Sequence, residues 1–363
     1  VGLLGLLFTF ALWARGITGS IVIGSVRGAF ARPGAGGLQG GGMMQRVAVV
    51  LGIFVVAAVC GFFPPAGSGL AGSTGGQLVV DRAGRRIETV RPFERIISLY
   101  PAHTENLFSL GLDREIIGVS PSETHPPAAL EKPVFSYHDD PEKFLAARPD
   151  LVLIRPMIDR GYAALVRRLE KSGITVVSLQ PATPDQMYRY WLALGRLTGR
   201  RAQGEKMVED FKRQLREITV VTGAISPKKR VYFEAIGRQM KTFSPDSISM
   251  FVLRAAGGLN VAEDADPVRG TNIAAYGKER ILSHADEIDV YIAQCGAMNR
   301  PTVASIASEP GFSAIDAVRE GRILIVDEAV VSRPTVRLLE GVPTIAGFLY
   351  PDLAGVPFGR GRP

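Results

Sequence analysis

Short apolar runs and amphipathic segments alternate along the chain from about residue 95 onward. Most of the runs are rich in Ile, Val and Leu and four or five residues long, which is typical of strands buried on both faces of a sheet. In the first half the sequence predicts strands at 95–99, 116–119, 151–154 and 175–179, and helices at 104–110, 141–147 and 162–171. This alternation predicts a parallel sheet covered by helices, preceded by a β-hairpin at 78–90.

The alternation pauses in the middle of the chain and resumes after Pro227. A helix at 186–197 is followed by a longer one at about 202–220, whose apolar residues form one narrow stripe on a charged surface. Such a helix either bridges two domains or covers the surface of one. The second half predicts strands at 230–234, 290–293 and 323–326, and helices at 248–255 and 336–349.

The predicted fold class is therefore α/β, with two Rossmann-like lobes of mostly parallel strands joined by a single long helix. The lobes are expected at 72–198 and 227–363, and the linking helix lies within 199–226. Ligands of open parallel sheets bind in loops at the carboxyl ends of the strands. Two such lobes facing one another predict a ligand cleft between them.

Residues 1–71 contain four arginines and no acidic residue. Met43–Arg46 is a short positive start, Val47–Phe63 is an uncharged run of 17 residues, and Gly69–Ala71 supplies the small residues of a cleavage site. This order predicts a signal peptide at 43–71, with an uncleaved membrane anchor as the alternative. The protein is therefore expected in the periplasm or another extracytoplasmic compartment.

Two further expectations concern this leader. The residues before Met43 are interpreted as an over-extended translation start, with a second membrane segment as the alternative. Cys60 would allow a lipid anchor, although Val59 stands where a lipobox has a small residue.

Composition excludes several classes of protein. The net charge of +7 falls to +3 without the four leader arginines, so no basic patch indicates nucleic-acid binding. Two cysteines are too few for a disulfide scaffold. Nucleophile-elbow, P-loop and zinc-protease motifs are also missing from the sequence, which favours a non-enzymatic protein.

Candidate ligand-binding residues were chosen from the loops that follow predicted strands. Aromatic rings can stack on a flat ligand, while guanidinium groups can pair with its carboxylate or catecholate oxygens. The blander interpretation of each arginine is a solvated surface charge. The candidates are Tyr100, Tyr137, His138 and Arg155 in the first lobe, and Arg238, Lys241, Asn272 and Arg333 in the second.

Several segments, in order along both lobes, carry a resemblance to a known family. They include Ile97–Glu105, Asp140–Leu153, Gly257–Val261 and Ser332–Pro334. Together they resemble the substrate-binding proteins of ABC importers for Fe(III)-siderophores, haem and cobalamin, over about 77–351. The resemblance implies a monomeric, non-enzymatic receptor with no intrinsic cofactor, which binds a metal chelate and delivers it to a permease dimer with its ATPase.

The resemblance also implies which residues dock on the permease. Glu142 and Glu279 stand where the family has one glutamate on each lobe that meets permease arginines. Without the resemblance, each would be read as an exposed glutamate favoured by the first turn of a helix.

The sequence departs from the cobalamin receptors. Positions where those carry Trp or Tyr around the corrin are here Ser122, Tyr137, Arg155, Lys241 and Ile273. More charge and fewer aromatic rings shift the expectation toward an anionic iron chelate, with a corrinoid still open. The alternatives are haem or metal-ion binding and, from another class, a metal-dependent enzyme that uses His138, Asp139 and Asp140.

Overall fold

The first lobe is built on a parallel sheet in the order β4–β3–β5–β6. The computed structural model describes residues 77–268 and 271–353, so the predicted signal peptide and Cys60 lie outside the described residues. The strands are β3 (Ile96–Ser98), β4 (Ile116–Val119), β5 (Leu151–Ile154) and β6 (Thr175–Ser178). The helices are α2 (Pro101–Ser109), η1 (Pro127–Glu131), α3 (Pro141–Ala147), α4 (Pro156–Gly161), α5 (Ala163–Lys171) and α6 (Pro184–Leu197).

Alternate residues of β5 enter different apolar cores, because successive side chains of a strand point to opposite faces. Leu151 and Leu153 join a cluster that contains Trp191 of α6, whereas Val152 and Ile154 join one that contains Phe144 of α3. The predicted parallel sheet with helices on both faces is therefore confirmed. The expected hairpin also forms, as the antiparallel pair β1 (Gln77–Val80) and β2 (Arg86–Thr89).

The sheet of the second lobe is mixed. Its order is β10–β11–β8–β7–β12–β13, with β9 also paired to β7. The strands are β7 (Arg230–Ile236), β8 (Lys241–Phe243), β9 (Leu259–Asn260), β10 (Asp266–Pro267), β11 (Ile273–Ala275), β12 (Val290–Cys295) and β13 (Ile323–Asp327). β7, β9, β12 and β13 pair in parallel, whereas β8, β11 and β10 add antiparallel ladders.

The antiparallel part arises just after β7. The chain passes through the short turn η2 (Gly237–Gln239) and reverses at Met240, which has a φ of 48°. A tight turn of this kind joins antiparallel neighbours, whereas a parallel pair needs a crossover of a dozen or more residues. The predicted parallel strands 230–234, 290–293 and 323–326 are the centre of this sheet, and the short strands β8 and β11 extend it.

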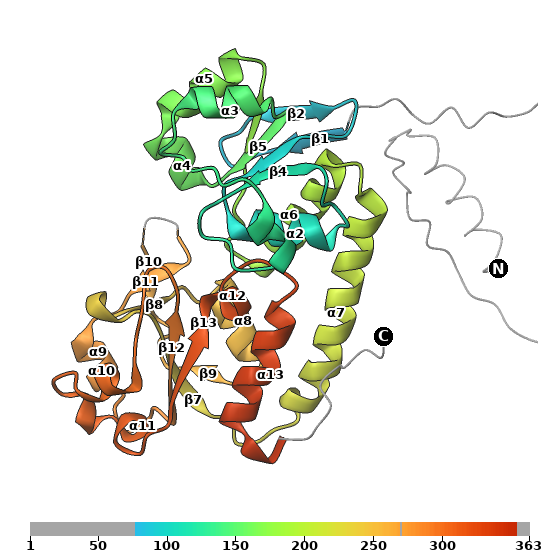
Figure 1. Cartoon of the computed structure of the whole chain (residues 1–363). Helices are drawn as coiled ribbons and strands as arrows, with labels where there is room; N and C mark the ends of the chain where they lie inside the picture. The colour runs from blue at the N-terminus through green and yellow to red at the C-terminus, as the bar shows by residue number, and fades with distance from the viewer. Residues whose placement is uncertain (1–76, 269–270, 354–363) are drawn as a thin grey trace, which may run out of the picture. The chain divides into compact units, whose positions relative to one another are not determined.

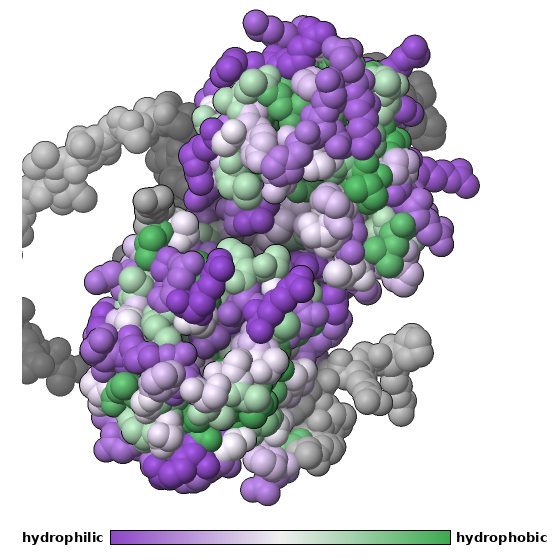
Figure 2. Space-filling view, turned by 60° about the vertical axis from the view of Figure 1, so that its left-hand side comes forward, coloured by the Kyte–Doolittle hydropathy of each residue, from purple (hydrophilic) through white to green (hydrophobic). Residues whose placement is uncertain are grey.

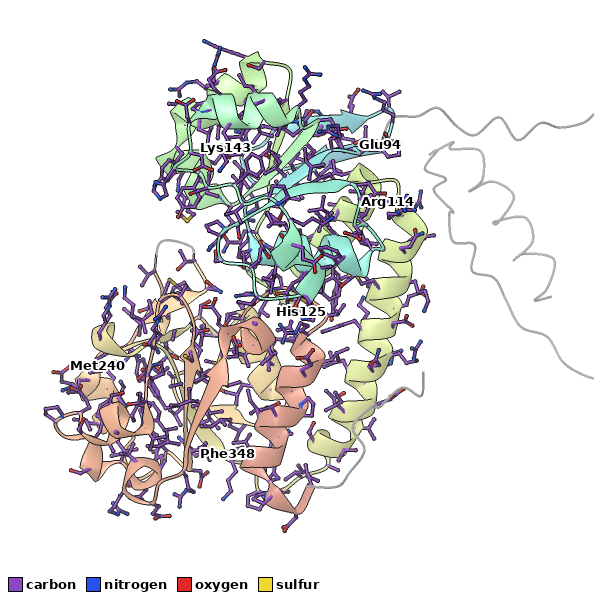
Figure 3. The ribbon with its side chains drawn as sticks, in the orientation of Figure 1. Glu94, Arg114, His125, Lys143, Met240 and Phe348 are labelled. Carbon is purple, nitrogen blue, oxygen red and sulfur yellow. The ribbon has the colours of Figure 1, made fainter. Side chains whose placement is uncertain are left out.

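The helices of the second lobe cover this sheet and close its loops. They are α8 (Ile248–Ala255), α9 (Lys278–Leu282), α10 (Val303–Ala307), η3 (Phe312–Ala314), α11 (Asp316–Arg319), α12 (Glu328–Val331), α13 (Leu338–Leu349) and η4 (Pro351–Leu353). The helix predicted at 336–349 thus begins two residues later, and α12 precedes it. Phe348, labelled in Figure 3, lies on α13.

The long helix α7 (Arg201–Gly223) runs beside both lobes (Figure 1). It packs on α6 of the first lobe and on α8 and α13 of the second. Its apolar stripe, which includes Met207, Phe211 and Ile218, is buried in one cluster shared by the two lobes. The described residues all fall within one compact unit. The bridging interpretation of this helix therefore holds, and the two lobes share a core through it.

Within the described ranges, the structure contains no helix that is both long enough and apolar enough to cross a membrane.

Candidate functional site

Two adjoining cavities lie between the lobes, of about 130 Å³ and 280 Å³. They share the side chains of Tyr100, Arg155, Ala297, Glu328 and Arg333, so we treat them together as the interlobe cleft. A hollow between the two lobes is visible in the space-filling view (Figure 2). Six of the eight predicted ligand residues line this cleft, namely Tyr100, Tyr137, His138, Arg155, Asn272 and Arg333.

The wall on the first lobe is formed where three neighbouring parallel strands end. Tyr100 follows β3, Arg155 follows β5, and Gln180 follows β6. The Arg155 guanidinium lies 4.5 Å from the centre of the Tyr100 ring, and its Nε donates to Oε1 of Gln180 at 3.3 Å. This cation–π contact and hydrogen bond hold the guanidinium at the cleft surface, half-buried, where it can meet a ligand.

Aromatic rings cluster beside this wall. The Tyr137 ring lies 4.5 Å from the His138 ring and 4.7 Å from the Tyr162 ring. The Tyr162 hydroxyl lies 3.2 Å from Nδ1 of His138. The three rings contact one another, since the His138 and Tyr162 ring centres are also only 5.1 Å apart, and Tyr137 and His138 line the cavity.

Two carboxylates next to His138 are engaged elsewhere. Asp139 accepts from the backbone N–H of Ser136 and from Nζ of Lys143, at 2.8 Å and 2.7 Å. The Lys143 hydrogen bond is the main reason that the pKa of Asp139 is lowered. Asp140 caps α3 by accepting from the backbone N–H of Glu142. Within the described ranges no group of three His, Cys, Asp or Glu side chains is placed to hold a metal ion.

Arg333 is buried and already neutralised. Its Nη1 donates to Oε1 of Glu105 in the first lobe at 2.9 Å, and its Nη2 donates to Oε1 of Glu328 at 3.3 Å. Burial would lower the pKa of Arg333, but the hydrogen bond and charge of Glu105 outweigh it and raise that pKa. The sequence predicts that Arg333 meets an anionic ligand. In the structure its positive charge is instead balanced by two carboxylates of the same chain.

The segment around Arg333 joins the lobes by further hydrogen bonds. The carbonyl of Pro334 accepts from Nδ2 of Asn106 and from Nε1 of Trp191, both at 2.9 Å. Asn106 and Trp191 belong to the first lobe and are fully buried. His125, labelled in Figure 3, lies at the same junction. The back of the cleft is thus a buried polar contact between the lobes.

Two predicted residues lie outside the cleft. Arg238 belongs to η2 and lines a different cavity in the second lobe. Lys241 opens β8, where its backbone pairs with Ile236 and Ala275, and it lines none of the cavities described here. Arg238 lies in the turn that directly follows β7, and Lys241 lies beyond the reversal at Met240, on the antiparallel strand β8.

The strand-end rule, by which ligand residues are predicted in the loops that follow strands, misses several residues in or next to the cleft. Gln180 follows β6 and could have been found by that same rule. Gln294 lies inside β12, and Glu328 begins α12. Neither stands in a loop, so their exposure to the cleft depends on how the lobes pack. Glu105 lies within the segment 97–105 that carries part of the family resemblance, but nothing in the sequence indicates its pairing with Arg333.

The two predicted docking glutamates differ in their surroundings. Glu142 is exposed in the first turn of α3 and pairs with Arg168 of α5 at 2.8 Å. Glu279 is exposed in the first turn of α9, and its side chain forms no ion pair with any residue the structure describes. Their role in docking stays a prediction.

This chain is similar to several known proteins. The family model "Periplasmic binding protein" matches residues 96–330. An uncharacterised ABC transporter substrate-binding lipoprotein of Bacillus subtilis is 27% identical, covering 76% of this chain and 86% of the relative. The vitamin B12-binding protein of Vibrio cholerae is 24% identical, covering 71% of this chain and 90% of the relative.

A solved structure agrees with both matches. It is described as a possible iron-binding (periplasmic solute-binding) protein of Staphylococcus epidermidis and superposes with a TM-score of 0.63 at 26% identity. The superposition covers 72% of this chain and all of that one. Since the family model spans more than half of the chain, and since the two-lobe fold and its cleft agree with it, the chain belongs to the periplasmic binding protein family.

Proposed function

We propose that this protein is an extracytoplasmic receptor that captures a metal chelate of low net charge, a corrinoid in the first place, and delivers it to an ABC permease. The observation that carries the choice of ligand is the charge balance of the cleft. Arg155, Arg333 and Glu328 line the cleft, and the guanidinium of Arg333 is paired with the carboxylates of Glu105 and Glu328. A trianionic catecholate would meet one free guanidinium, that of Arg155, instead of the two expected from the sequence.

The neutral lining of the cleft suits a corrinoid. The amides of Gln180, Asn272 and Gln294 and the hydroxyl groups of Ser122 and Ser136 line its two cavities. The corrin ring carries amide side chains at its edge, which need hydrogen-bond donors and acceptors when they leave water. Tyr100 adds a hydroxyl group that is neutral at physiological pH, and burial raises its pKa further. These groups replace the Trp-rich lining that the sequence lacks.

Relatives support this ligand class. A vitamin B12-binding protein aligns with most of this chain and with most of its own length. An iron chelate is the second candidate, favoured by the Staphylococcus epidermidis structure described as a possible iron-binding protein. Ferric hydroxamates fit the same charge balance, since three singly charged hydroxamates neutralise one Fe(III).

Delivery would use the two exposed glutamates. Glu142 and Glu279 lie in first turns of short helices, one on each lobe. Charges at the rim of an interface steer encounter and fix orientation more than they add affinity. One carboxylate on each lobe would give a permease dimer one contact per subunit.

Calorimetric titration tests the proposal. The protein, as an expressing cell exports it, is titrated with cyanocobalamin, with ferrioxamine and with haemin. Cyanocobalamin is expected to bind with a Kd of about 1 μM or tighter, which corresponds to about −8.2 kcal/mol. Binding of ferrioxamine alone would transfer the function to the second candidate. Failure of all three to bind more tightly than about 10 μM would refute the receptor role for this ligand class.

A further inference from the structure

The second lobe contains a larger cavity than either part of the cleft. It measures about 680 Å³ and opens between the η2 turn and the segment 297–301. We call it the C-lobe cavity. Its lining includes Arg238, Met240, Met298, Arg300, Ile306 and Phe312. Met240 is labelled in Figure 3, on the side of the second lobe away from α7.

The walls of this cavity are fixed by a buried carboxylate. Glu234, at 4% exposure, accepts from the Tyr291 hydroxyl at 2.6 Å and from Nδ2 of Asn299 at 2.8 Å. Oδ1 of Asn299 in turn accepts from the backbone N–H of Gly237 at 3.1 Å. A Cβ at Gly237 would lie 2.7 Å from Oε1 of Glu234, so the η2 turn sits directly on this carboxylate. The cavity is therefore formed before any ligand arrives.

The backbone beside η2 is also strained. Met240 has a φ of 48°, a left-handed conformation that costs a residue with a Cβ free energy. Its backbone N–H donates to the carbonyl of Gly237, and its own carbonyl accepts from Gly277. Strain of this kind is retained where the surroundings enforce it, and it concentrates at ligand-binding segments.

The free charges of the C-lobe cavity are positive. Arg238 and Arg300 are exposed, and neither side chain forms a hydrogen bond or ion pair with any part of the chain that the structure describes. Of the two acidic residues of the lining, Glu309 pairs with Lys278, and both oxygens of Glu234 are occupied. The two guanidinium groups are thus available to an anion, for which bidentate phosphate pairing is their preferred geometry.

The floor of the cavity is apolar. Ile306 and Phe312 are buried, at 4% and 2% exposure, and the thioethers of Met240 and Met298 adapt to ligand shape. An anionic group attached to a flat apolar one therefore matches this cavity better than a free inorganic ion does.

The C-lobe cavity and the interlobe cleft share a wall. Ala297 lines both parts of the cleft and the C-lobe cavity, and Met298 lines the cavity and one part of the cleft. A ligand arm that extended from the cleft past these two residues would enter the C-lobe cavity. We propose that the C-lobe cavity receives a pendant arm of the chelate: the nucleotide arm of a complete corrinoid, with its phosphate on Arg238 and Arg300 and its aromatic base over Ile306 and Phe312. In this arrangement the bond between the base nitrogen and the cobalt breaks, and a water molecule takes the axial position that the base leaves. This assignment rests on the proposed function.

Two corrinoids that differ in this arm, and in the cobalt ligand that its base supplies, provide the test. Cyanocobalamin carries the phosphate and the base, whereas dicyanocobinamide has the same corrin without them. For the unaltered protein we expect cyanocobalamin to bind at least about tenfold more tightly, as expected from charge-assisted hydrogen bonds. In the double variant Arg238→Ala/Arg300→Ala this preference should fall to near unity, with the Kd for dicyanocobinamide unchanged.

A matched control removes the same two charges elsewhere. Arg213→Ala/Arg216→Ala changes two arginines on α7, outside all the cavities described, and should keep the preference. The arm assignment would be overturned if the cavity variant lost the same affinity for both corrinoids, or if it kept the preference for cyanocobalamin. In either case, binding of dicyanocobinamide would still support the proposed function. Failure of both corrinoids to bind would overturn the proposed function and the arm with it.

Discussion

Arg333 of the second lobe and Glu105 of the first form a buried ion pair, with Nη1 and Oε1 2.9 Å apart and side-chain exposures of 10% and 2%. Desolvating two charges is expensive, so such a pair stabilises a protein little compared with a well-packed apolar pair. Removing one partner alone, however, leaves a buried charge with too little compensation. The contact therefore specifies how the lobes meet more than it adds to stability.

The first prediction follows from this asymmetry. Arg333→Met is expected to lower the free energy of unfolding by about 3–5 kcal/mol, whereas Arg333→Met/Glu105→Leu should cost clearly less than the two single changes together. Urea unfolding followed by the fluorescence of Trp191 measures both. Arg337→Met serves as the control, since its partner Glu340 is exposed and such pairs contribute about 0–1 kcal/mol. Additive single changes would contradict the coupling.

The second prediction concerns Arg155. If its guanidinium is the free charge of the cleft, Arg155→Ala should weaken cyanocobalamin binding by about tenfold or more, as is typical of a hydrogen bond to a charged group. Arg155→Lys should recover only part of the loss, because an ammonium group cannot stack flat on Tyr100. Arg160→Ala, an exposed change on the adjoining helix α4, should bind as the unaltered protein does. Calorimetry that finds no difference between Arg155→Ala and Arg160→Ala would remove Arg155 from the site.

Tyr100 and Arg155, which were predicted from strand ends, lie together in the cleft for a physical reason. Neighbouring parallel strands end at the same edge of a sheet, so residues that follow β3 and β5 must lie close together. Two other predicted residues lie outside the cleft: Arg238 stands in the η2 turn at a different cavity, and Lys241 follows the reversal at Met240, which makes the next strand antiparallel. The sequence gives little warning of this turn, since β8 is only three residues long and Met240 is not the glycine that a left-handed turn favours.

The state of Arg333 could not be predicted from the sequence at all. Its partner Glu105 is 228 residues away, and the pair exists only because the lobes pack at that point. Local patterns predict the elements of each lobe, since period and turn chemistry are local properties. Interlobe packing decides which charges remain free in the cleft, and the proposed ligand class depends on that balance.

The third prediction is a pH dependence. His103 is buried with Nδ1 2.6 Å from the Tyr190 hydroxyl, and burial lowers its pKa to about 3. The unfolded chain binds this proton below a pKa of about 6.5, so stability is fully present above that value and declines as the pH falls toward about 3. The slope from this group approaches 1.4 kcal/mol per pH unit. His103→Asn should remove that slope in urea titrations between pH 7 and pH 4.5, and identical slopes would contradict the prediction.

The fourth prediction separates delivery from capture. Glu142→Lys/Glu279→Lys should leave the Kd for cyanocobalamin unchanged and reduce uptake in cells at least about tenfold, because like charges would face the permease arginines. Glu217→Lys, an exposed change on α7, is the control. Arg168→Ala should not reduce uptake, since it frees Glu142 from its present partner. Normal uptake with both glutamates reversed would exclude this docking mode.

The fifth prediction concerns motion between the lobes. Opening the cleft would require α7 to bend or the polar contact behind it to break, and that contact includes the Arg333–Glu105 pair and the bonds of Asn106 and Trp191 to Pro334. Each group is buried, so an opening that separates these partners without admitting water would leave unpaired donors and acceptors at a cost of about 1–3 kcal/mol apiece. We therefore expect ligand binding to rotate the lobes by about a few degrees, well short of the hinge closure of other binding proteins. Solution scattering with and without cyanocobalamin measures this. The triple variant Asn106→Ala/Arg333→Met/Glu105→Leu should rotate further on binding, because α7 then remains the main restraint between the lobes. A large closure of the unaltered protein would show that these contacts do not hold the lobes.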